Sequence, residues 1–179
     1  MGHTDLTAVN ADLGRNAPAL VEWALGLGKT SIVTTNFRPF EAVILHMVTQ
    51  VNPKVPVVWM DNGYNTEATY RFADEVTKQL GLNLKIYLPL RSRAHREAVE
   101  GPTPALDDPR HAAFTAEVKL EPFARALRET APEVWFTALR ATDTAVRAQM
   151  DPVRASTPTG SSRWRRCCTG RPKTCTSTA

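Results

Sequence analysis

The sequence predicts an α/β fold with a parallel sheet, and three observations support this prediction. Residues 31–35 (SIVTT) and 55–60 (VPVVWM) are short apolar runs without clean alternation, which is typical of strands covered on both faces. Residues 42–48, between them, place apolar side chains at helical spacing. A strand, a helix and a second strand in this order indicate a right-handed crossover between parallel strands.

The residues before the first strand predict one or two helices and a turn. Apolar side chains recur along residues 10–27, and Pro18 suits the first turn of a helix. Gly26 and Gly28 then precede the strand. A phosphate-binding P-loop follows its strand and carries two glycines five positions apart. We therefore interpret GLGK at residues 26–29 as the end of a helix and a turn.

The residues after the second strand predict another helix and a third strand. Asn65 or Thr66 is expected to cap the helix, and Gly81 is expected to end it. Residues 82–88 then predict the third strand. The sheet is thus extended by a second strand–helix–strand unit.

A basic stretch separates this part from the last predicted elements. Residues 91–111 contain GPTPALDDPR and predict a mobile surface loop, interpreted as a solvated basic turn in preference to an anion-binding lid. Residues 118–129 predict an amphipathic helix, and residues 133–137 a fourth strand that runs into a polar helix. The apolar face of the amphipathic helix is expected to consist of Leu120, Phe123, Ala124 and Leu127.

Length and composition indicate one soluble domain. The chain has 179 residues, of which 42% are hydrophobic and 22% charged. No apolar run approaches the roughly 20 residues of a membrane span, and the amino terminus does not resemble a secretory signal. We therefore expect a cytoplasmic protein without a membrane partner.

The net charge of +4 comes from the carboxyl-terminal tail, residues 154–179. The tail has no acidic residue and six basic ones, namely Arg154, Arg163, Arg165, Arg166, Arg171 and Lys173. Removing these six from the 22 basic residues leaves 16 against 18 acidic ones. The basic character therefore gives no reason to expect a nucleic-acid partner for the domain.

Two loops are the predicted binding site. In parallel sheets, ligands lie beyond the carboxyl ends of the strands, which here means residues 35–39 and 61–64. Amides at the start of the helix that follows the first loop are expected to bind phosphate oxygens, because the helix dipole favours negative charge there.

Four segments of the chain resemble the sulfonucleotide reductases, which reduce phosphoadenylyl sulfate (PAPS) or adenylyl sulfate to sulfite. They are NFRPFEAVILH, VVWMDNGYNTEATYRFADEVTKQLGLNLKIY, VKLEPFARAL and WFTALRATDTAVRA, and the resemblance runs over residues 20–151. It implies a Rossmann-like nucleotide-binding fold of the adenine nucleotide alpha hydrolase-like type. The expected organisation is a PAPS-reductase-like domain at residues 1–153 and an aberrant, disordered basic tail at residues 154–179.

The resemblance implies a set of substrate-binding residues. They are Asn36, Phe37, Arg38, Glu41, Asp61, Gly63, Tyr64, Arg140 and Arg147. Arg140 and Arg147 are seven residues apart, so on one helix both would face the same side. Arg38 stands where the family has glycine, and it would either offer a charged fork to the anion or fill the space that the nucleotide needs. Ala141 and Asp143 also depart from the family pattern.

The resemblance further implies partners and the absence of a metal centre. The substrate would be PAPS, its product adenosine 3′,5′-bisphosphate (PAP), the reductant thioredoxin or glutaredoxin, and the pathway sulfate assimilation toward cysteine biosynthesis; a homodimer is compatible. Phe114 and Thr115 stand where iron–sulfur members carry a cysteine pair, so we expect no iron–sulfur cluster.

The tail implies a chain without the catalytic thiol. Its composition resembles no protein core, and a one-base frameshift after about residue 153 accounts for it. The family's nucleophilic cysteine belongs to a later carboxyl-terminal segment, and Cys167, Cys168 and Cys175 do not match its motif. The chain is therefore expected to be truncated and inactive as a reductase, with no catalytic residue assigned.

Two other functions stay open at this point. One is an ATP-pyrophosphatase-type enzyme that adenylylates its substrate on the same fold, although the chain has no Ser-Gly-Gly-x-Asp-Ser loop. The other is a non-enzymatic nucleotide- or protein-binding module, which the departures at Arg38, Ala141 and Asp143 favour. A panel of nucleotides in a thermal-shift assay would separate the three functions.

Overall fold

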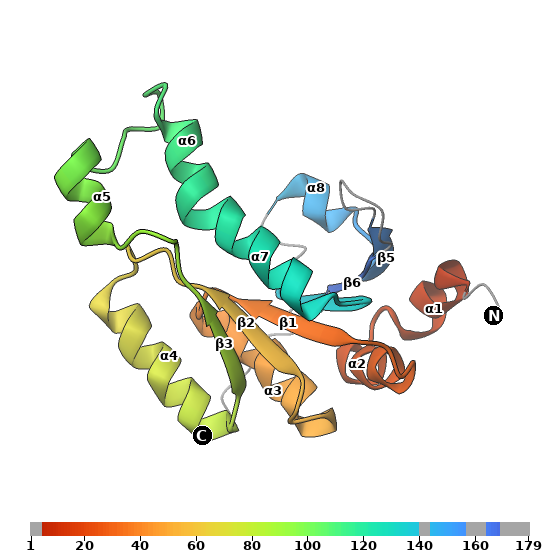
Figure 1. Ribbon diagram of the computed structural model, residues 1–179. Helices are drawn as coiled ribbons and strands as arrows, with labels where there is room; N and C mark the ends of the chain where they lie inside the picture. Colours follow the sequence, from red (N-terminus) through yellow and green to blue (C-terminus); the bar gives the residue numbers. More distant parts are fainter. Residues whose placement is uncertain (1–4, 140–143, 157–163, 169–179) are drawn as a thin grey trace, which may run out of the picture.

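The computed structural model describes residues 5–139, 144–156 and 164–168. Six strands form one sheet in the order β3-β2-β1-β4-β6-β5 (Figure 1). The strands are β1 (Ser31–Thr35), β2 (Pro56–Met60), β3 (Asn83–Tyr87), β4 (Val134–Thr137), β5 (Val153–Ser156) and β6 (Trp164–Cys168). All neighbours pair in parallel except β5, which runs antiparallel to β6. The predicted parallel sheet is therefore confirmed.

Helices cover both faces of the sheet. They are α1 (Leu6–Leu13), α2 (Ala17–Gly26), α3 (Ala42–Val51), α4 (Glu67–Leu80), α5 (Arg93–Glu100), α6 (His111–Thr115), α7 (Glu121–Thr130) and α8 (Ala145–Ala148). A short 3-10 turn, η1 (Pro39–Glu41), precedes α3, and a π-helical turn, η2 (Ala116–Leu120), joins α6 to α7. In Figure 1, α3 and α4 lie on one face and α7 on the other, while α5 and α6 extend beyond the edge of the sheet.

The strand residues alternate between two apolar clusters. Val33, Val57 and Phe136 belong to the larger cluster with residues of α2, α3 and α4. Ile32, which precedes Val33, and Val58, which follows Val57, belong to the second cluster with residues of α7. Burial on both sides explains why these strands lack polar alternation in the sequence.

The predicted caps are confirmed. The Thr66 hydroxyl accepts a hydrogen bond from the Thr69 amide at 3.2 Å and so caps α4. Gly81 ends that helix at a φ of 59°, a left-handed conformation that glycine adopts without steric cost. Residues 26–30 form the end of α2 and the turn into β1, as interpreted from the sequence.

The buried face of the amphipathic helix is only partly the predicted one, because Leu120 and Ala124 are exposed. Leu120 is 55% exposed, whereas Val118 and Ala126 are buried and Pro122 lies between them on the same stripe. Phe123 was predicted correctly, because its ring packs 5.3 Å from that of Trp135. Leu127 was also predicted correctly, because it packs against the cluster that contains Ile32 and Val58. Hydrophobicity alone did not identify the other buried positions, since Leu120 is more apolar than the buried Pro122 and Ala126.

The carboxyl-terminal residues differ from the expected disordered tail. Val153–Ser156 and Trp164–Cys168 are strands, so the expected boundary after residue 153 falls inside β5. The side-chain amide of Asn10 donates to the Val153 carbonyl at 2.7 Å and accepts from its amide at 2.9 Å. Strand pairing uses backbone groups, so polar side chains do not prevent β6 from extending the sheet beside β4. Residues 157–163 and 169–179 lie outside the described part of the chain.

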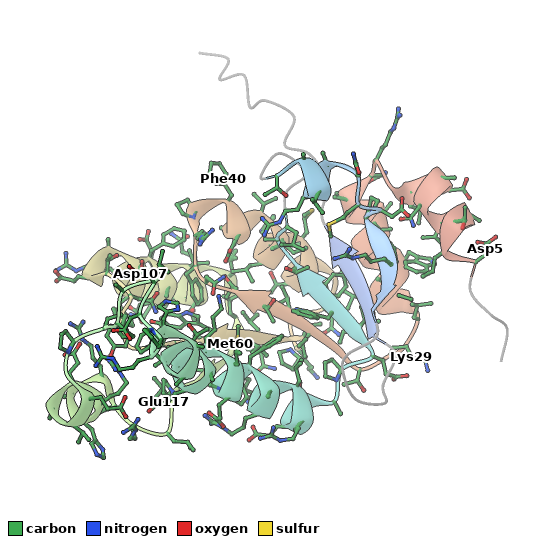
Figure 2. All side chains as sticks on the ribbon, turned by 90° about the horizontal axis from the view of Figure 1, so that it is seen from above. Asp5, Lys29, Phe40, Met60, Asp107 and Glu117 are labelled. Carbon is green, nitrogen blue, oxygen red and sulfur yellow. The ribbon has the colours of Figure 1, made fainter. Side chains whose placement is uncertain are left out.

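Figure 2 shows the two ends of the first strands, which are marked by Lys29 and Met60. Lys29, before β1, lies at the end where the first strands begin, and Met60 closes β2 near the opposite end. Among the described helices, none is both long enough and apolar enough to cross a membrane.

Candidate functional site

The carboxyl ends of β1 and β2 meet at one edge of the sheet, because the two strands are parallel neighbours. β1 also has β4 on its other side, so the strand order reverses around β1. Crevices at such switch points are where open α/β sheets bind ligands. The two loops predicted from the sequence therefore lie at the same edge.

The loop after β1 is fixed by Phe37. This residue is 3% exposed, and its ring lies edge-on to that of Trp59 in β2, with 5.0 Å between centroids. Its φ is 52°, a left-handed conformation that is costly for a residue with a Cβ. The Phe37 amide donates to the Thr35 hydroxyl at 2.9 Å. Burial of the ring thus holds the backbone in a conformation that the residue would otherwise avoid.

Glu41 closes this loop from the start of the next helix. One of its carboxylate oxygens accepts from the Asn36 amide at 2.6 Å and from the Thr35 hydroxyl at 2.8 Å. The amides of Asn36 and Phe37 are thus both engaged within the loop, and the Glu41 carboxylate holds the loop together. The side chains of Asn36 and Arg38 are exposed.

The turn after β2 is organised by Asp61, which is 8% exposed. Its Oδ1 accepts three hydrogen bonds, from the Gly63 amide at 3.0 Å, the Asn65 side-chain amide at 2.9 Å and the Tyr70 hydroxyl at 2.8 Å. Burial, and after it the bond to Asp61, raise the pKa of Tyr70. Gly63 has a φ of 79°, which explains the glycine at this position.

Tyr64 is the point where α5 and α6 contact this turn. Its hydroxyl accepts from Nε of Arg96 at 2.8 Å, and its ring lies 4.8 Å from the guanidinium carbon of Arg93. The Phe114 ring of α6 lies 5.5 Å away in an edge-on arrangement. The sequence analysis missed these contacts because it treated the basic stretch as a loop.

Helix α5 was nevertheless detectable in the sequence. Ser92 caps it by accepting from the His95 amide at 3.2 Å, and Gly101 follows its last residue. A serine before good helix formers and a glycine after them is a standard helix signature. Residues 101–110 lack helix and strand, as predicted.

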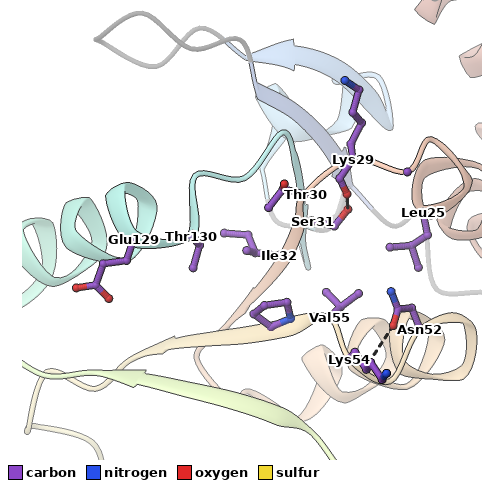
Figure 3. A pocket seen from close by; sticks show the side chains of 12 residues that line it. Leu25, Lys29, Thr30, Ser31, Ile32, Asn52, Lys54, Val55, Glu129 and Thr130 are labelled. Carbon is purple, nitrogen blue, oxygen red and sulfur yellow. Dashed lines mark hydrogen bonds between the residues drawn. The ribbon is translucent and has the colours of Figure 1, made fainter.

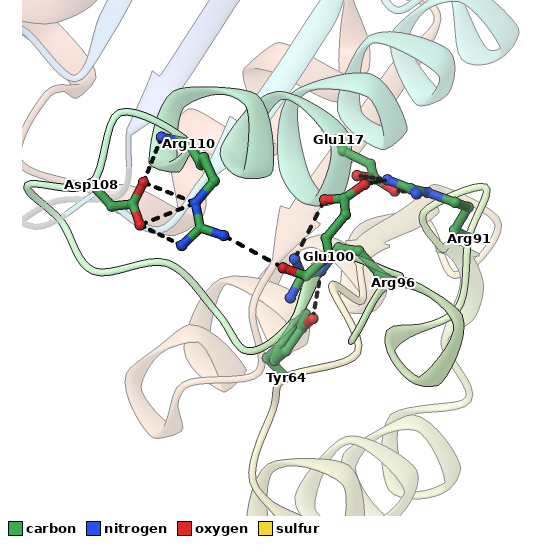
Figure 4. A network of polar contacts seen from close by, with 7 residues as sticks. All are labelled: Tyr64, Arg91, Arg96, Glu100, Asp108, Arg110 and Glu117. Atoms are coloured by element: carbon green, nitrogen blue, oxygen red, sulfur yellow. Dashed lines mark hydrogen bonds and ion pairs between the residues drawn. The ribbon is translucent and has the colours of Figure 1, made fainter. Parts of the chain in front are cut away.

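The arginines of this region are paired with carboxylates (Figure 4). Arg91 donates to the two carboxylate oxygens of Glu117 at 2.7 and 2.6 Å and also reaches Glu100 at 2.5 Å. Arg110 forms a similar pair with Asp108 at 2.7 Å, which with other contacts lowers the pKa of Asp108 to about 2. Arg91, its two carboxylate partners and Arg110 line a cavity of about 440 Å³. The stretch is therefore a balanced charge network and not a bare cationic surface.

The Arg91–Glu117 pair predicts an acid-dependent loss of stability. The hydrogen bonds from Arg91 hold the pKa of Glu117 below its usual range. A carboxyl with a depressed folded pKa contributes stability above its unfolded pKa of about 4.3, and this is lost as pH falls through the folded value. We expect the melting temperature of the unaltered chain to fall more steeply between pH 5 and pH 3 than that of Glu117→Gln. Calorimetry of both chains across that range checks this, and parallel curves would contradict it.

Arg147 lies on α8, whose cap is Thr144; the Thr144 hydroxyl accepts from the Arg147 amide at 3.2 Å. Thr144 is extended, so no continuous helix joins Arg140 to Arg147. The argument from helical spacing is therefore wrong for this pair. Arg140 itself lies outside the described residues.

Another cavity, of about 550 Å³, lies at the opposite end of the strands, where β1 and β2 begin (Figure 3). Lys29, Lys54 and Glu129 line it, together with the residues that begin β1 and β2. Lys29 pairs with Glu133 at 2.9 Å. The GLGK segment thus precedes its strand and lies away from the edge with the predicted site.

The described residues can now be compared with known proteins. The model of the phosphoadenosine phosphosulfate reductase domain matches residues 30–165. The chain belongs to this family. The resemblance stated from the four sequence segments is therefore confirmed.

Curated relatives in this family carry the name phosphoadenosine 5′-phosphosulfate reductase. The relative from Synechococcus sp. is 38% identical over 151 residues, which cover 82% of this chain and 64% of the relative. That from Xanthomonas euvesicatoria pv. vesicatoria is 42% identical over 147 residues, covering 81% of this chain and 61% of the relative. The chain thus spans less than two thirds of the length of these reductases.

Solved structures share the fold. The PAPS reductase from Candida auris, in a phosphate complex, aligns with a TM-score of 0.76 at 21% identity, over 94% of this chain and 80% of that one. The FMN adenylyltransferase of Candida glabrata, in complex with FMN and an ATP analogue, aligns with a TM-score of 0.59 at 13% identity, over 94% of this chain and 54% of that one. At these identities the likeness concerns the fold alone, which is the expected nucleotide-binding α/β fold.

Proposed function

We propose that this chain binds an adenosine sulfonucleotide, PAPS or its product PAP, at the carboxyl edge of β1 and β2. The observation that carries the proposal is the contact between Phe37 and Trp59, which fixes the first loop against β2 at the switch point. Membership of the phosphoadenosine phosphosulfate reductase domain family supports the choice of ligand.

The proposed ligand contacts come from three segments. The exposed side chains of Asn36 and Arg38 and the turn at Gly63 and Tyr64 supply donors at the ends of β1 and β2. Arg140 and Arg147 follow β4, the other neighbour of β1, and would add charge-assisted bonds to phosphate or sulfate oxygens. Glu41 and Asp61 would act indirectly, by holding the two loops.

The family relation also supports a proposal about pathway and reductant. The reaction would belong to sulfate assimilation toward cysteine biosynthesis in the cytoplasm, with thioredoxin or glutaredoxin as the reductant and a homodimer as a compatible assembly. We assign the required thiol to none of the cysteines of this chain, so we propose binding without detectable reduction. The Phe114 ring packs between Tyr64 and Arg96, so this position does not fit a ligand of an iron–sulfur cluster.

A thermal-shift measurement tests the proposed binding. PAP is expected to raise the melting temperature, because a ligand that binds only the native state stabilises it, by about 2.7 kcal/mol at a concentration 100 times its Kd. Arg140→Ala should weaken binding by about 1.5–3 kcal/mol if the guanidinium makes a charge-assisted bond. Titrations of both chains with PAP measure the difference.

Arg128→Ala is the matched control, because Arg128 is exposed on the last turn of α7. Its loss should leave the PAP-induced shift unchanged. A shift with ATP but not with PAP would favour an adenylylating enzyme instead. No shift with any nucleotide would contradict the proposal, and sulfite release from PAPS with thioredoxin would contradict the assignment of no thiol.

A further inference from the structure

Arg96 is a buried arginine beneath the proposed nucleotide site. The residue is 2% exposed, whereas the side chains of Arg91, Arg93 and Arg110 are 32%, 54% and 67% exposed. Burial of a guanidinium is costly unless its charge and its donors find partners. The contacts of Arg96 therefore show whether its burial serves stability.

The partners of Arg96 do not compensate fully for this burial. Its Nε donates to the Tyr64 hydroxyl at 2.8 Å, and its Nη1 lies 3.8 Å from a Glu100 carboxylate oxygen, beyond ordinary hydrogen-bond distance. Its Nη2 is buried without a hydrogen-bond partner among the described residues. Buried donors left without partners reduce stability. An apolar side chain of similar length would suit a purely structural role better.

The geometry around Arg96 points to Tyr64. The guanidinium carbon lies 4.6 Å from the centre of the Phe114 ring, so the group is held against α6. Its Nε reaches the Tyr64 hydroxyl, as Figure 4 shows. A guanidinium can only donate, so the Tyr64 oxygen must act as acceptor in this bond. The single phenolic proton is therefore left to donate to another group. Held in this way, Tyr64 offers a hydrogen-bond donor beside the turn that Asp61 organises.

We propose that Arg96 is a positioning residue that fixes Tyr64 as a hydrogen-bond donor to an acceptor oxygen of the bound nucleotide. This inference rests on the proposed function, since it assigns a role within the same site. Arg96 itself stays behind the tyrosine and does not contact the ligand. The acceptor is a phosphate, sulfate or ribose oxygen, the groups that a phenol would recognise on this substrate class.

The test separates affinity from stability. Arg96→Met should weaken PAP binding by about 5- to 30-fold and leave the melting temperature of the free chain nearly unchanged. Methionine removes the buried Nη2 donor that has no partner, and the carboxylate of Glu100, whose side chain is 44% exposed, stays hydrated. Arg96→Lys, which can still donate to the tyrosine, should recover part of the affinity. A merely structural arginine would instead lower the melting temperature and leave the Kd of the folded fraction unchanged. Arg128→Met is the control for loss of one positive charge.

A double-mutant cycle shows whether Arg96 acts through Tyr64. Tyr64→Phe should weaken PAP binding to a similar extent, and adding Arg96→Met to it should change the Kd by less than about twofold. Independent, additive losses would overturn the positioning role, as would an Arg96→Met chain that binds PAP like the unaltered one. Absence of PAP binding by the unaltered chain would overturn the proposed function and this inference with it. If Arg96→Met fails to fold, Tyr64→Phe and Arg96→Lys still test the inference, because a Tyr64→Phe chain that binds PAP like the unaltered one would overturn it.

Discussion

Replacing Phe37 by alanine is expected to lower the free energy of unfolding by about 3–4 kcal/mol, within the range measured for large aromatic residues in cores. The ring is almost fully buried against Trp59, so its removal leaves a cavity between the loop and β2. The burial of the ring also offsets the cost of the left-handed backbone at this residue, and alanine keeps that strain without the compensating contact. Urea unfolding at pH 7 measures the change.

Phe40→Ala is the matched control for this prediction. Phe40 lies three residues further along and is 63% exposed, so its truncation should change stability by only about 0.5 kcal/mol. The Phe37 variant should also lose the PAP-induced shift, because the loop would no longer be held at the switch point. Equal stability losses in the two variants would show that Phe37 does not anchor the loop.

Asp61→Ala is expected to lower the free energy of unfolding by about 2–4 kcal/mol. The carboxylate oxygen Oδ1 accepts bonds from Gly63, Asn65 and Tyr70, and its removal leaves these donors without their partner in a partly buried turn. Each buried donor without a partner costs about 1–3 kcal/mol, and those that find water cost less. The same urea unfolding experiment measures the loss, and PAP titration reports on the turn itself.

Asp61→Asn separates the hydrogen bonds from the volume of the side chain. Asparagine keeps an oxygen at the same position and should lose less than half as much stability as alanine, since only the charge assistance of the bonds is weakened. Tyr70→Phe removes a single donor and should cost about 1 kcal/mol. If alanine and asparagine had equal effects, the three bonds to Oδ1 would not be what holds the turn.

The location of the candidate site could be predicted from the sequence, but the role of each of its residues could not. The sequence predicts that two strands end before residues 36 and 61. Because parallel neighbours place their carboxyl ends together, this prediction was enough to locate the site. The roles of Glu41 and Asp61 depend on which donors reach their carboxylates, and those donors are decided by side-chain geometry. Both stay predicted as substrate-binding residues, and the structure adds that their carboxylates hold the two loops.

Arg96 illustrates a second limit. It stands in a basic stretch, and charge alone predicts exposure, because an isolated guanidinium is strongly hydrated. Its burial follows from contacts with Tyr64 and Phe114, which lie 32 residues before it and 18 after it in the chain. No local pattern records such a contact.

The sequence by itself determined the parallel sheet, the order of its first four strands along the chain, the caps at Thr66 and Gly81, and the family. These depend on local backbone preference and on periodic burial, which neighbouring residues encode. The structure was needed to show that Leu120 is exposed, that Arg96 is buried, and that Trp164–Cys168 pairs between β4 and β5. Those outcomes depend on backbone hydrogen bonds and packing between distant segments, for which composition and periodicity carry no signal.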